Sequence, residues 1–135
     1  MKNLFQEGDK KIYTTEVTED KLATFNSGPV HPVYGTFALG RDAEWAGRLF
    51  VLDMIEHEEE FVGAYLDITH ISPALLGSKV RFEATFQKID AKGAVHTLYE
   101  AYCGDRLIAK GKQIQHPIDK QRFQRYIETL SQPEP

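Results

Sequence analysis

The sequence has little cysteine and no long apolar run, and both absences narrow the class of protein. Cys103 is the one cysteine among 135 residues, so no disulfide can form within the chain. No segment approaches the roughly 18 apolar residues of a membrane span, and the opening MKNLFQEGDKK lacks the apolar core of a signal peptide. The sequence therefore predicts a cytoplasmic protein that does not enter a membrane.

Basic residues are too few for a protein whose main partner is nucleic acid. Lys and Arg number 16 against 20 Asp and Glu, which gives a formal net charge of −4, whereas phosphate binding needs a concentrated basic face. The stretch HEEEF lacks the second histidine of the HExxH zinc pattern. His31, His57, His96 and His116 show no ligand spacing, so we expect no metal site.

What remains is the composition of an ordinary globular protein, with 41% hydrophobic and 27% charged residues. At 135 residues the chain is long enough to bury a core without help from disulfides or metal. We expect residues 1–135 to form a single domain, with a core over about residues 8–116 and a C-terminal helix over about 118–130.

Apolar periodicity predicts strands on both sides of one long helix. Residues 10–17 are rich in β-branched residues and predict a first strand, whereas Gly-Pro and His-Pro pairs predict a loop over 26–36. A helix is predicted from Thr36, as its N-cap, to about Ile55. Four strands in antiparallel hairpins are predicted at 61–70, 79–89, 94–103 and 106–116, the last ended by Pro117. This order predicts an α+β fold with an antiparallel sheet wrapped around one long central helix.

Small residues and one carboxylate share a face of the predicted helix. The positions at spacings of three and four are Thr36, Gly40, Glu44, Gly47, Val51 and Met54. Each glycine costs about 1 kcal/mol relative to alanine, which indicates a face lying close against the sheet or a second subunit. The flanking residues are heavily apolar, so we expect the helix to be buried nearly all round. Because an unpaired buried charge is costly, Glu44 must be hydrogen-bonded, protonated or facing a cleft.

A histidine lies where the apolar alternation of the 61–70 strand ends. Val62, Ala64, Leu66 and Ile68 are predicted to share one face, and His70 is the next residue in that register. Two interpretations fit a lone histidine here. One is a half-buried structural side chain, and the other is a catalytic imidazole aimed under the sheet.

These residues resemble the hotdog-fold thioesterases and, among them, the fluoroacetyl-CoA thioesterase-like family. The resemblance rests on Thr36, on Glu44 eight positions later, and on His70 twenty-six beyond that, within THISPALLGSKV. Gly63, seven residues before His70, matches a glycine of the family. The resemblance covers roughly residues 8 to 116 and implies a hotdog fold.

The resemblance also implies an acyl-CoA thioesterase for a small or medium acyl group, acting without metal or cofactor. It implies a homodimer paired through the strand near 61–70, with active sites at the subunit interface. Thr36 is then the nucleophile or the group that places water, Glu44 the base or a nucleophilic carboxylate, and His70 the proton shuttle. Backbone N–H groups near Thr36 and Phe37 would polarise the thioester carbonyl. The expected substrate-binding residues are Gly63, Phe37 and His31.

One position departs from the family pattern. The family commonly has an arginine near the end of the last strand, four residues after a glycine, and GKQIQ puts Gln115 there. The role is then vacant or passes to Lys110 or Lys112. The expected coenzyme A contacts are therefore Lys110, Lys112 and Gln115.

Several alternatives stay open at this point. Eight residues of regular helix span about 12 Å, so Thr36 and Glu44 touch only if Thr36 lies in a folded-back loop or if they meet across a dimer. Thr36 as a plain N-cap and Glu44 as a structural core carboxylate also fit. At the level of function, the alternatives are a non-catalytic acyl-CoA-binding hotdog protein and a hotdog hydratase. The close Asp–His pair of such hydratases is not found.

Overall fold

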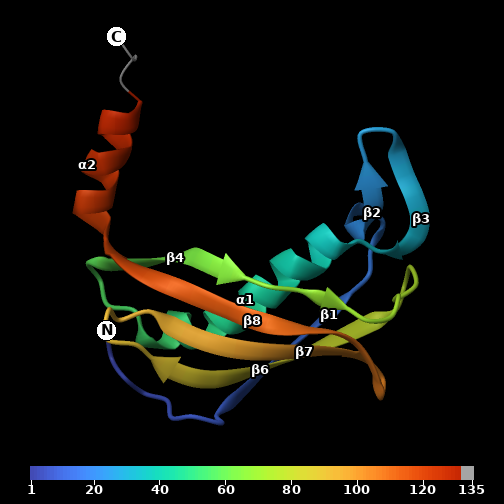
Figure 1. Cartoon of the computed structure of the whole chain (residues 1–135), viewed down its shortest axis with the longest axis horizontal. Helices are drawn as coiled ribbons and strands as arrows, with labels where there is room; N and C mark the ends of the chain where they lie inside the picture. The colour runs from blue at the N-terminus through green and yellow to red at the C-terminus, as the bar shows by residue number, and fades with distance from the viewer. Residues whose placement is uncertain (132–135) are drawn as a thin grey trace.

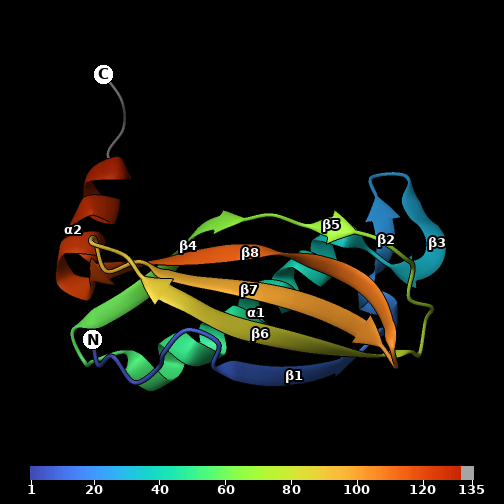
Figure 2. The same cartoon turned by 60° about the horizontal axis from the view of Figure 1, so that its bottom comes forward.

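An antiparallel sheet wraps around one long helix in the computed structural model, which describes residues 1–131 (Figures 1 and 2). In chain order the elements are β1 (Lys10–Glu16), the 3-10 helix η1 (Glu19–Lys21), β2 (Leu22–Phe25), β3 (Gly28–Tyr34), α1 (Thr36–Met54), β4 (Glu59–Leu66), β5 (Thr69–His70), β6 (Lys79–Ile89), β7 (Val95–Cys103), β8 (Arg106–Asp119) and α2 (Lys120–Leu130). The main sheet has the order β1-β6-β7-β8-β4, with β5 also paired to β8, and β2 and β3 form a sheet of their own. The predicted α+β arrangement around a central helix is confirmed. None of the described helices is long and apolar enough to cross a membrane.

The best-predicted strand is β6, which spans the predicted 79–89. Val80, Phe82, Ala84 and Phe86 are buried against α1, as their alternation predicts. Phe50 of α1 packs on Phe86, with ring centroids 5.7 Å apart. The centre of the core therefore lies between α1 and the concave face of the sheet.

The predicted loop over 26–36 is wrong, because β3 occupies most of it and pairs with β2 in a hairpin. The Gly-Pro and His-Pro pairs disfavour helix but allow extended backbone. Proline also lacks an N–H, and a two-stranded hairpin has outer edges where that donor is not needed. Gly28, with φ +104°, supplies the left-handed turn between the two strands.

Helix α1 spans Thr36–Met54, close to the prediction, but its N-cap is Gly35 rather than Thr36. Its small-residue stripe lies against the sheet, so no second subunit is needed to explain it. A Cβ on Gly47 would overlap the Gln113 amide, and one on Gly40 would come within 2.8 Å of Ile68 Cδ1. The expectation of burial nearly all round is wrong. The side of the helix away from the stripe is open, where Trp45 and Leu52 are 42% and 43% exposed, and Phe37 in the first turn is 85% exposed.

The predicted continuous strand over 61–70 is wrong, because it is divided into β4 and β5. A bulge between Gly63 and Tyr65 inserts Ala64, which is exposed. The bulge reverses the alternation, so Phe61 is buried and Gly63 lies against Glu44. The predicted face of Val62 and Ala64 is therefore the outer one at this end of the strand.

Asp67 marks the break between β4 and β5. Its carbonyl accepts a hydrogen bond from Tyr99 Oη at 2.8 Å, and its Oδ1 accepts from the Lys112 N–H at 3.0 Å. The backbone comes so near to Gly111 that a Cβ there would overlap the Asp67 carbonyl. Beyond this break His70 pairs with Ala109 of β8, which brings the histidine to the N-terminal end of α1.

Strand β8 continues through Pro117 to Asp119, so the prediction that Pro117 ends it is wrong. The pairing of β7 with β8 stops at Gln115, and beyond that only β4 lies beside β8. A proline is tolerated there because one side of the strand needs no donor. Asp119 then caps α2, since its Oδ1 accepts from the Arg122 N–H at 2.9 Å.

Candidate active site

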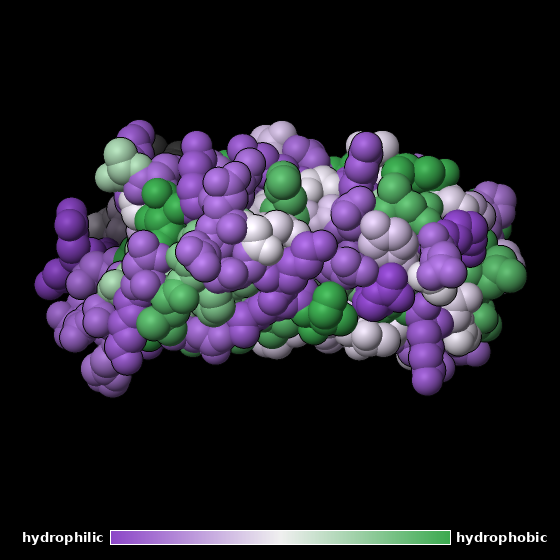
Figure 3. All heavy atoms as spheres, turned by 90° about the horizontal axis from the view of Figure 1, so that it is seen from below, coloured by the Kyte–Doolittle hydropathy of each residue, from purple (hydrophilic) through white to green (hydrophobic). Residues whose placement is uncertain are grey.

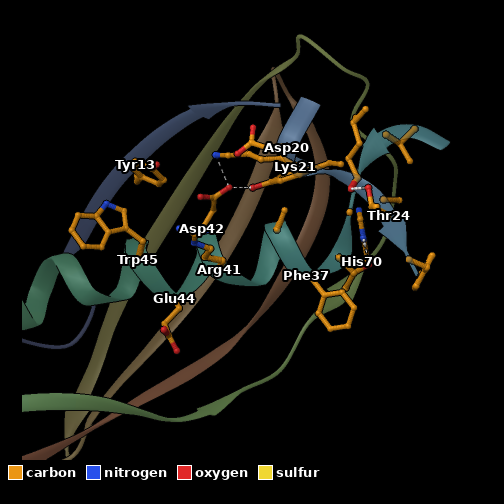
Figure 4. Close-up of a pocket in the computed structure, with 18 of the residues that line it drawn as sticks. Tyr13, Asp20, Lys21, Thr24, Phe37, Arg41, Asp42, Glu44, Trp45 and His70 are labelled. Carbon is orange, nitrogen blue, oxygen red and sulfur yellow. Dashed lines mark hydrogen bonds and ion pairs between the residues drawn. The ribbon is translucent and has the colours of Figure 1, made fainter. Parts of the chain in front are cut away.

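A cavity of about 1000 Å³ lies between the β2–β3 hairpin, the N-terminal half of α1 and β5 (Figure 4). Thr36, Phe37, Glu44, Trp45 and His70 are among the residues that line it. Three chain segments that are far apart in sequence therefore meet around one space. A cavity of this size accommodates a small organic ligand.

Thr36 and His70 contact each other at one end of the cavity. Thr36 Oγ1 lies 3.0 Å from His70 Nδ1. The threonine is the first helical residue, and because Gly35 is the N-cap, its hydroxyl is not committed to capping. His70 Nε2 is buried and has no hydrogen-bond partner among the described residues. The pair thus combines a hydroxyl with an imidazole whose second nitrogen makes no hydrogen bond within the described chain.

Glu44 lies on another part of the cavity wall, as Figure 4 shows. It is half-buried, and its Oε1 rests on Gly63 so closely that a Cβ there would overlap it. Since Thr36 and Glu44 are both helical, about 12 Å of helix separates them. Of the possibilities raised by the sequence, the structure supports a carboxylate that faces a cleft. The fold places Thr36 beside His70 and Glu44 beside Gly63.

Phe37 and His31, two predicted substrate contacts, lie in different surroundings. Phe37 lies in the first turn of α1, and its side chain lines the cavity. His31 is exposed on β3, where it pairs with Ala23, and it is not among the cavity-lining residues. Within the single chain His31 thus lies outside this cavity, because β3 is a strand of a projecting hairpin rather than a loop folded over the helix.

The predicted coenzyme contacts also separate into two groups. Gln115 is only 2% exposed, and its Nε2 donates to Gln113 Oε1 at 2.6 Å. This side chain is an interior group under α1 and has no open side toward a coenzyme. Lys110 is exposed, and Lys112 is partly exposed on the same strand. Lys110 pairs with Thr69, next to His70.

Arg48, which the sequence analysis did not single out, lies beside Gln115. Its Nη1 donates to the Phe61 carbonyl at 2.8 Å and to Gln115 Oε1 at 3.2 Å, and its Nη2 donates to Glu60 Oε1 at 3.1 Å. Arg48 also lines the cavity, one helical turn after Glu44. A guanidinium therefore contacts Gln115, but it comes from the helix and not from the last strand.

Asp42 is the second residue that sequence reasoning missed. It is 7% exposed, accepts a hydrogen bond from the Tyr34 hydroxyl, and pairs with Lys21 Nζ at 3.0 Å (Figure 4). Burial and the nearby carboxylate raise the pKa of Tyr34 well above its usual range, so its hydroxyl stays protonated. Lys21 precedes β2 and Tyr34 ends β3, so Asp42 fixes both ends of the hairpin to α1. A sequence signal for Asp42 was available, because it lies three residues after Leu39 and so on the side of α1 that faces the core.

The comparisons with known proteins agree on one family. The family model for the fluoroacetyl-CoA-specific thioesterase FlK matches residues 17–121. The chain belongs to the FlK family. Membership makes it a thioester hydrolase of acyl-CoA substrates, so the predicted family and enzyme class are confirmed. A comparison with curated protein sequences gives no match.

Solved structures that resemble the chain support the same assignment. A thioesterase superfamily member from Thermus thermophilus is 33% identical, with a TM-score of 0.87 over 93% of this chain and 92% of that one. FlK itself is 18% identical, with a TM-score of 0.86 over 97% and 100%. A hot-dog-like protein from Thermanaerovibrio acidaminovorans is 16% identical, with a TM-score of 0.87 over 97% and 96%. The hotdog fold is confirmed. A FlK variant is known in complex with acetyl-CoA.

Proposed function

We propose that the protein hydrolyses the coenzyme A thioester of a small or medium acyl group, with Thr36 as nucleophile and His70 as base. The observation that carries this proposal is the 3.0 Å contact between Thr36 Oγ1 and His70 Nδ1 at the cavity wall. A hydroxyl within hydrogen-bond reach of an imidazole nitrogen is the arrangement that activates a nucleophile.

The proposed reaction has two steps. In the first, Thr36 Oγ1 bonds to the thioester carbonyl carbon while its proton passes to His70 Nδ1. The C–S bond then breaks, and the imidazolium returns the proton to the sulfur, which leaves as free coenzyme A. In the second, a water molecule gives a proton to His70 and attacks the acyl-threonine. The carboxylic acid is released, and Thr36 regains its hydroxyl.

The oxyanion of each tetrahedral intermediate needs donors, and the start of α1 offers them. The first N–H groups of a helix have no partner within the helix, and the helix dipole favours negative charge there. Thr36 and Phe37 are the first two helical residues. We assign the stabilisation of the oxyanion to these backbone N–H groups.

In this proposal Glu44 acts on the water of the second step and not on the Thr36 hydroxyl. It lies about two helical turns from Thr36 and faces the same cavity. A carboxylate in that position holds water in the cavity from which the second step draws. The contact with Gly63 fixes its direction.

We place substrate contacts at Phe37 and Gly63, and the coenzyme phosphates near Lys110 and Lys112. The cavity of about 1000 Å³ also has to hold part of the coenzyme, which favours a short acyl group. The proposal does not include a preference for fluorinated substrates, which the family name alone does not imply. The proposed reaction uses no metal, and among residues 1–131 no cluster of three potential metal ligands occurs.

We also propose a homodimer formed through the edge near 61–70. Strand β4 ends the main sheet, so one side of its backbone has no neighbouring strand within the described chain. Such an edge favours pairing with another strand. The rest of this proposal is one hotdog domain over residues 1–135 and a cytoplasmic location, where the free thiol of Cys103 stays reduced.

The test is the release of free thiol from a panel of acyl-CoAs, acetyl through long-chain and aromatic. We expect Thr36→Ala, His70→Ala and Glu44→Gln each to lower turnover at least about 100-fold, the scale of a lost acid–base group. Thr69→Ala is the matched control, because Thr69 is exposed beside His70 and does not line the cavity. Mass spectrometry of quenched reactions should find the acyl group on Thr36.

The outcomes separate the parts of the proposal. Wild-type turnover in Thr36→Ala, with its fold intact, would show that water attacks directly and that Thr36 is not the nucleophile. Thiol release that does not depend on His70 would remove the histidine from the mechanism. Silence across the whole panel, with the protein folded, would contradict the proposed function and favour a non-catalytic acyl-CoA-binding protein or a hydratase.

A further inference from the structure

Helix α2 has an apolar stripe that nothing in the described chain covers. None of its side chains is buried. The exposed apolar residues recur at helical spacing and are Phe123, Tyr126, Ile127 and Leu130. A stripe of this kind on a projecting helix indicates a partner surface.

The position of α2 in the molecule limits what that partner is. Helix α2 follows β8 directly and starts beside the first residues of β4, where the Lys120 N–H donates to the Glu58 carbonyl at 3.0 Å. Figures 1 and 2 show α2 and the β2–β3 hairpin projecting in the same direction, beyond the sheet edge formed by β4 and β5, at opposite ends of that edge. The two projections therefore flank the free edge of the sheet.

A two-fold axis at this edge exchanges its ends. If β4 pairs antiparallel with β4 of a second copy, the symmetry brings the α2 helix of each copy to the end where the other copy has its hairpin. The opposite side of the molecule, formed by the N-terminal segment, β1 and β6, is mostly hydrophilic with scattered apolar side chains (Figure 3). The proposed dimer pairs instead through the β4 edge, the side toward which α2 and the hairpin project.

The hairpin offers a matching surface. Phe25 and Val30 are exposed on it, although both are large apolar side chains. Charge matches as well, since Arg122 and Arg125 are exposed on α2, and Glu19 and Asp20 are exposed at the base of the hairpin. Opposite charges at the rim of an apolar contact fix its register.

We infer that the apolar stripe of α2 packs on the β2–β3 hairpin of a second copy of this chain. Because the hairpin forms one wall of the cavity that holds Thr36 and His70, each subunit holds the cavity wall of the other in place. This inference rests on the proposed homodimer and goes beyond it. It gives α2 a role in substrate binding by the neighbouring subunit.

Cross-linking between chains tests the contact directly. Two differently tagged chains are co-expressed, both with Cys103→Ala, one with Ile127→Cys in α2 and the other with Val30→Cys in the hairpin. We expect oxidation to give a disulfide between the two tags. The matched control replaces Val30→Cys with Leu98→Cys, which lies exposed on β7. The expected yield with Val30→Cys is at least about tenfold that of the control.

A charge substitution provides a second measurement. Ile127→Asp should raise the dimer dissociation constant at least about tenfold and raise the KM for acyl-CoA, because the hairpin loses its support. Gln124→Asp introduces the same charge outside the stripe and should change neither value. Equal effects of the two variants would overturn the inference.

The outcomes distinguish this inference from the proposed function. A dimer that releases thiol but gives no disulfide above the control means that the α2 contact is wrong, while the function stands. A specific disulfide in a protein that releases no thiol means that the contact is right and the proposed function wrong. Binding of the wild-type protein, but not of Ile127→Asp, to vesicles of anionic phospholipid, without the disulfide, means that the stripe faces a membrane and overturns the inference.

Discussion

Glu44 and Gly63 depend on each other, because the carboxylate rests where any β-carbon on residue 63 would lie. Gly63→Ala keeps the backbone of β4 but pushes the carboxylate away. We expect turnover to fall about tenfold to 100-fold, since small displacements of a positioned group carry such losses. The measurement is thiol release, together with thermal unfolding to show that the fold is kept.

The control for this prediction removes the carboxylate first. In a Glu44→Ala background the added methyl group of Gly63→Ala meets no oxygen, so the second substitution should cost nothing further. A full additional loss in the double variant would mean that residue 63 acts on the substrate itself and not through Glu44.

The chemistry of single residues could be predicted from the sequence better than their contacts. Thr36 and His70 were singled out as catalytic candidates from the sequence, and both line the cavity. Their contact depends on the break at Asp67, where the backbone passes over Gly111. Nothing in the local pattern of apolar residues shows such a close approach. Asp42 was missed for a related reason, because its partners, Tyr34 and Lys21, lie on a hairpin that was predicted as a loop.

Among the elements, α1 lies against the sheet with glycine at the contact. Gly47→Ala gains about 1 kcal/mol in helix propensity, but its β-carbon would overlap the side chain of Gln113. That amide is 1% exposed, and it contacts Thr97 and Gln115. We expect the free energy of unfolding to fall by about 1–3 kcal/mol, measured by chemical denaturation.

Gly40→Ala is the matched variant on the same stripe. Its β-carbon would meet the ends of the Ile68 and Leu66 side chains, which are partly buried and able to move. The loss of stability should therefore be smaller than for Gly47→Ala. A larger loss of stability for Gly40→Ala than for Gly47→Ala would show that Gln113 and its polar neighbours move aside more easily than Ile68 and Leu66.

The turn between β6 and β7 gives a pH-dependent prediction. Asp90 accepts hydrogen bonds from His96 and from the N–H groups of Ala94 and Lys92, which together lower its pKa from 3.8 to about 2. An acid with a lower pKa in the folded chain stabilises the fold above its unfolded pKa. That contribution is lost as the pH falls to the folded value.

Asp90→Asn should therefore destabilise the protein at pH 7 and progressively less between pH 3.8 and about 2. The measurement is the difference in the free energy of unfolding between the two proteins across this range. A difference that does not change with pH would mean that the carboxylate charge contributes nothing and that only the shape of the turn matters.

Element types were predictable where a single period ran through a whole segment. β6 alternates without interruption and α1 has one continuous stripe, so both were found nearly to the residue. β4 and β5 were predicted as one strand, because a bulge leaves the number of apolar residues in a strand unchanged while it exchanges the faces they point to. The hairpin was missed because proline and glycine predict the absence of helix more strongly than they predict the presence of a strand.

On the scale of the whole molecule, the sheet is closed at neither edge. We expect a mass in solution of twice the 15.4 kDa of one chain, because pairing of β4 with a second copy satisfies its unpaired backbone groups. Sedimentation over a range of concentrations measures it. Tyr65 is exposed beside the bulge in β4, and Tyr65→Asp should shift the equilibrium toward monomer. A single-chain mass at every concentration would contradict the dimer.

The β2–β3 hairpin is a sheet of its own, fixed to the body at its base by Asp42. Its tip can therefore gain or lose residues without shifting the register of any strand in the main sheet. Doubling the length of a flexible loop costs only about 0.6 kcal/mol. Evolution, or a library of hairpins of different lengths, can thus reshape the cavity wall while Thr36 and His70 stay in contact where they are. Acyl-group preference is consequently the property of this enzyme that can diverge fastest.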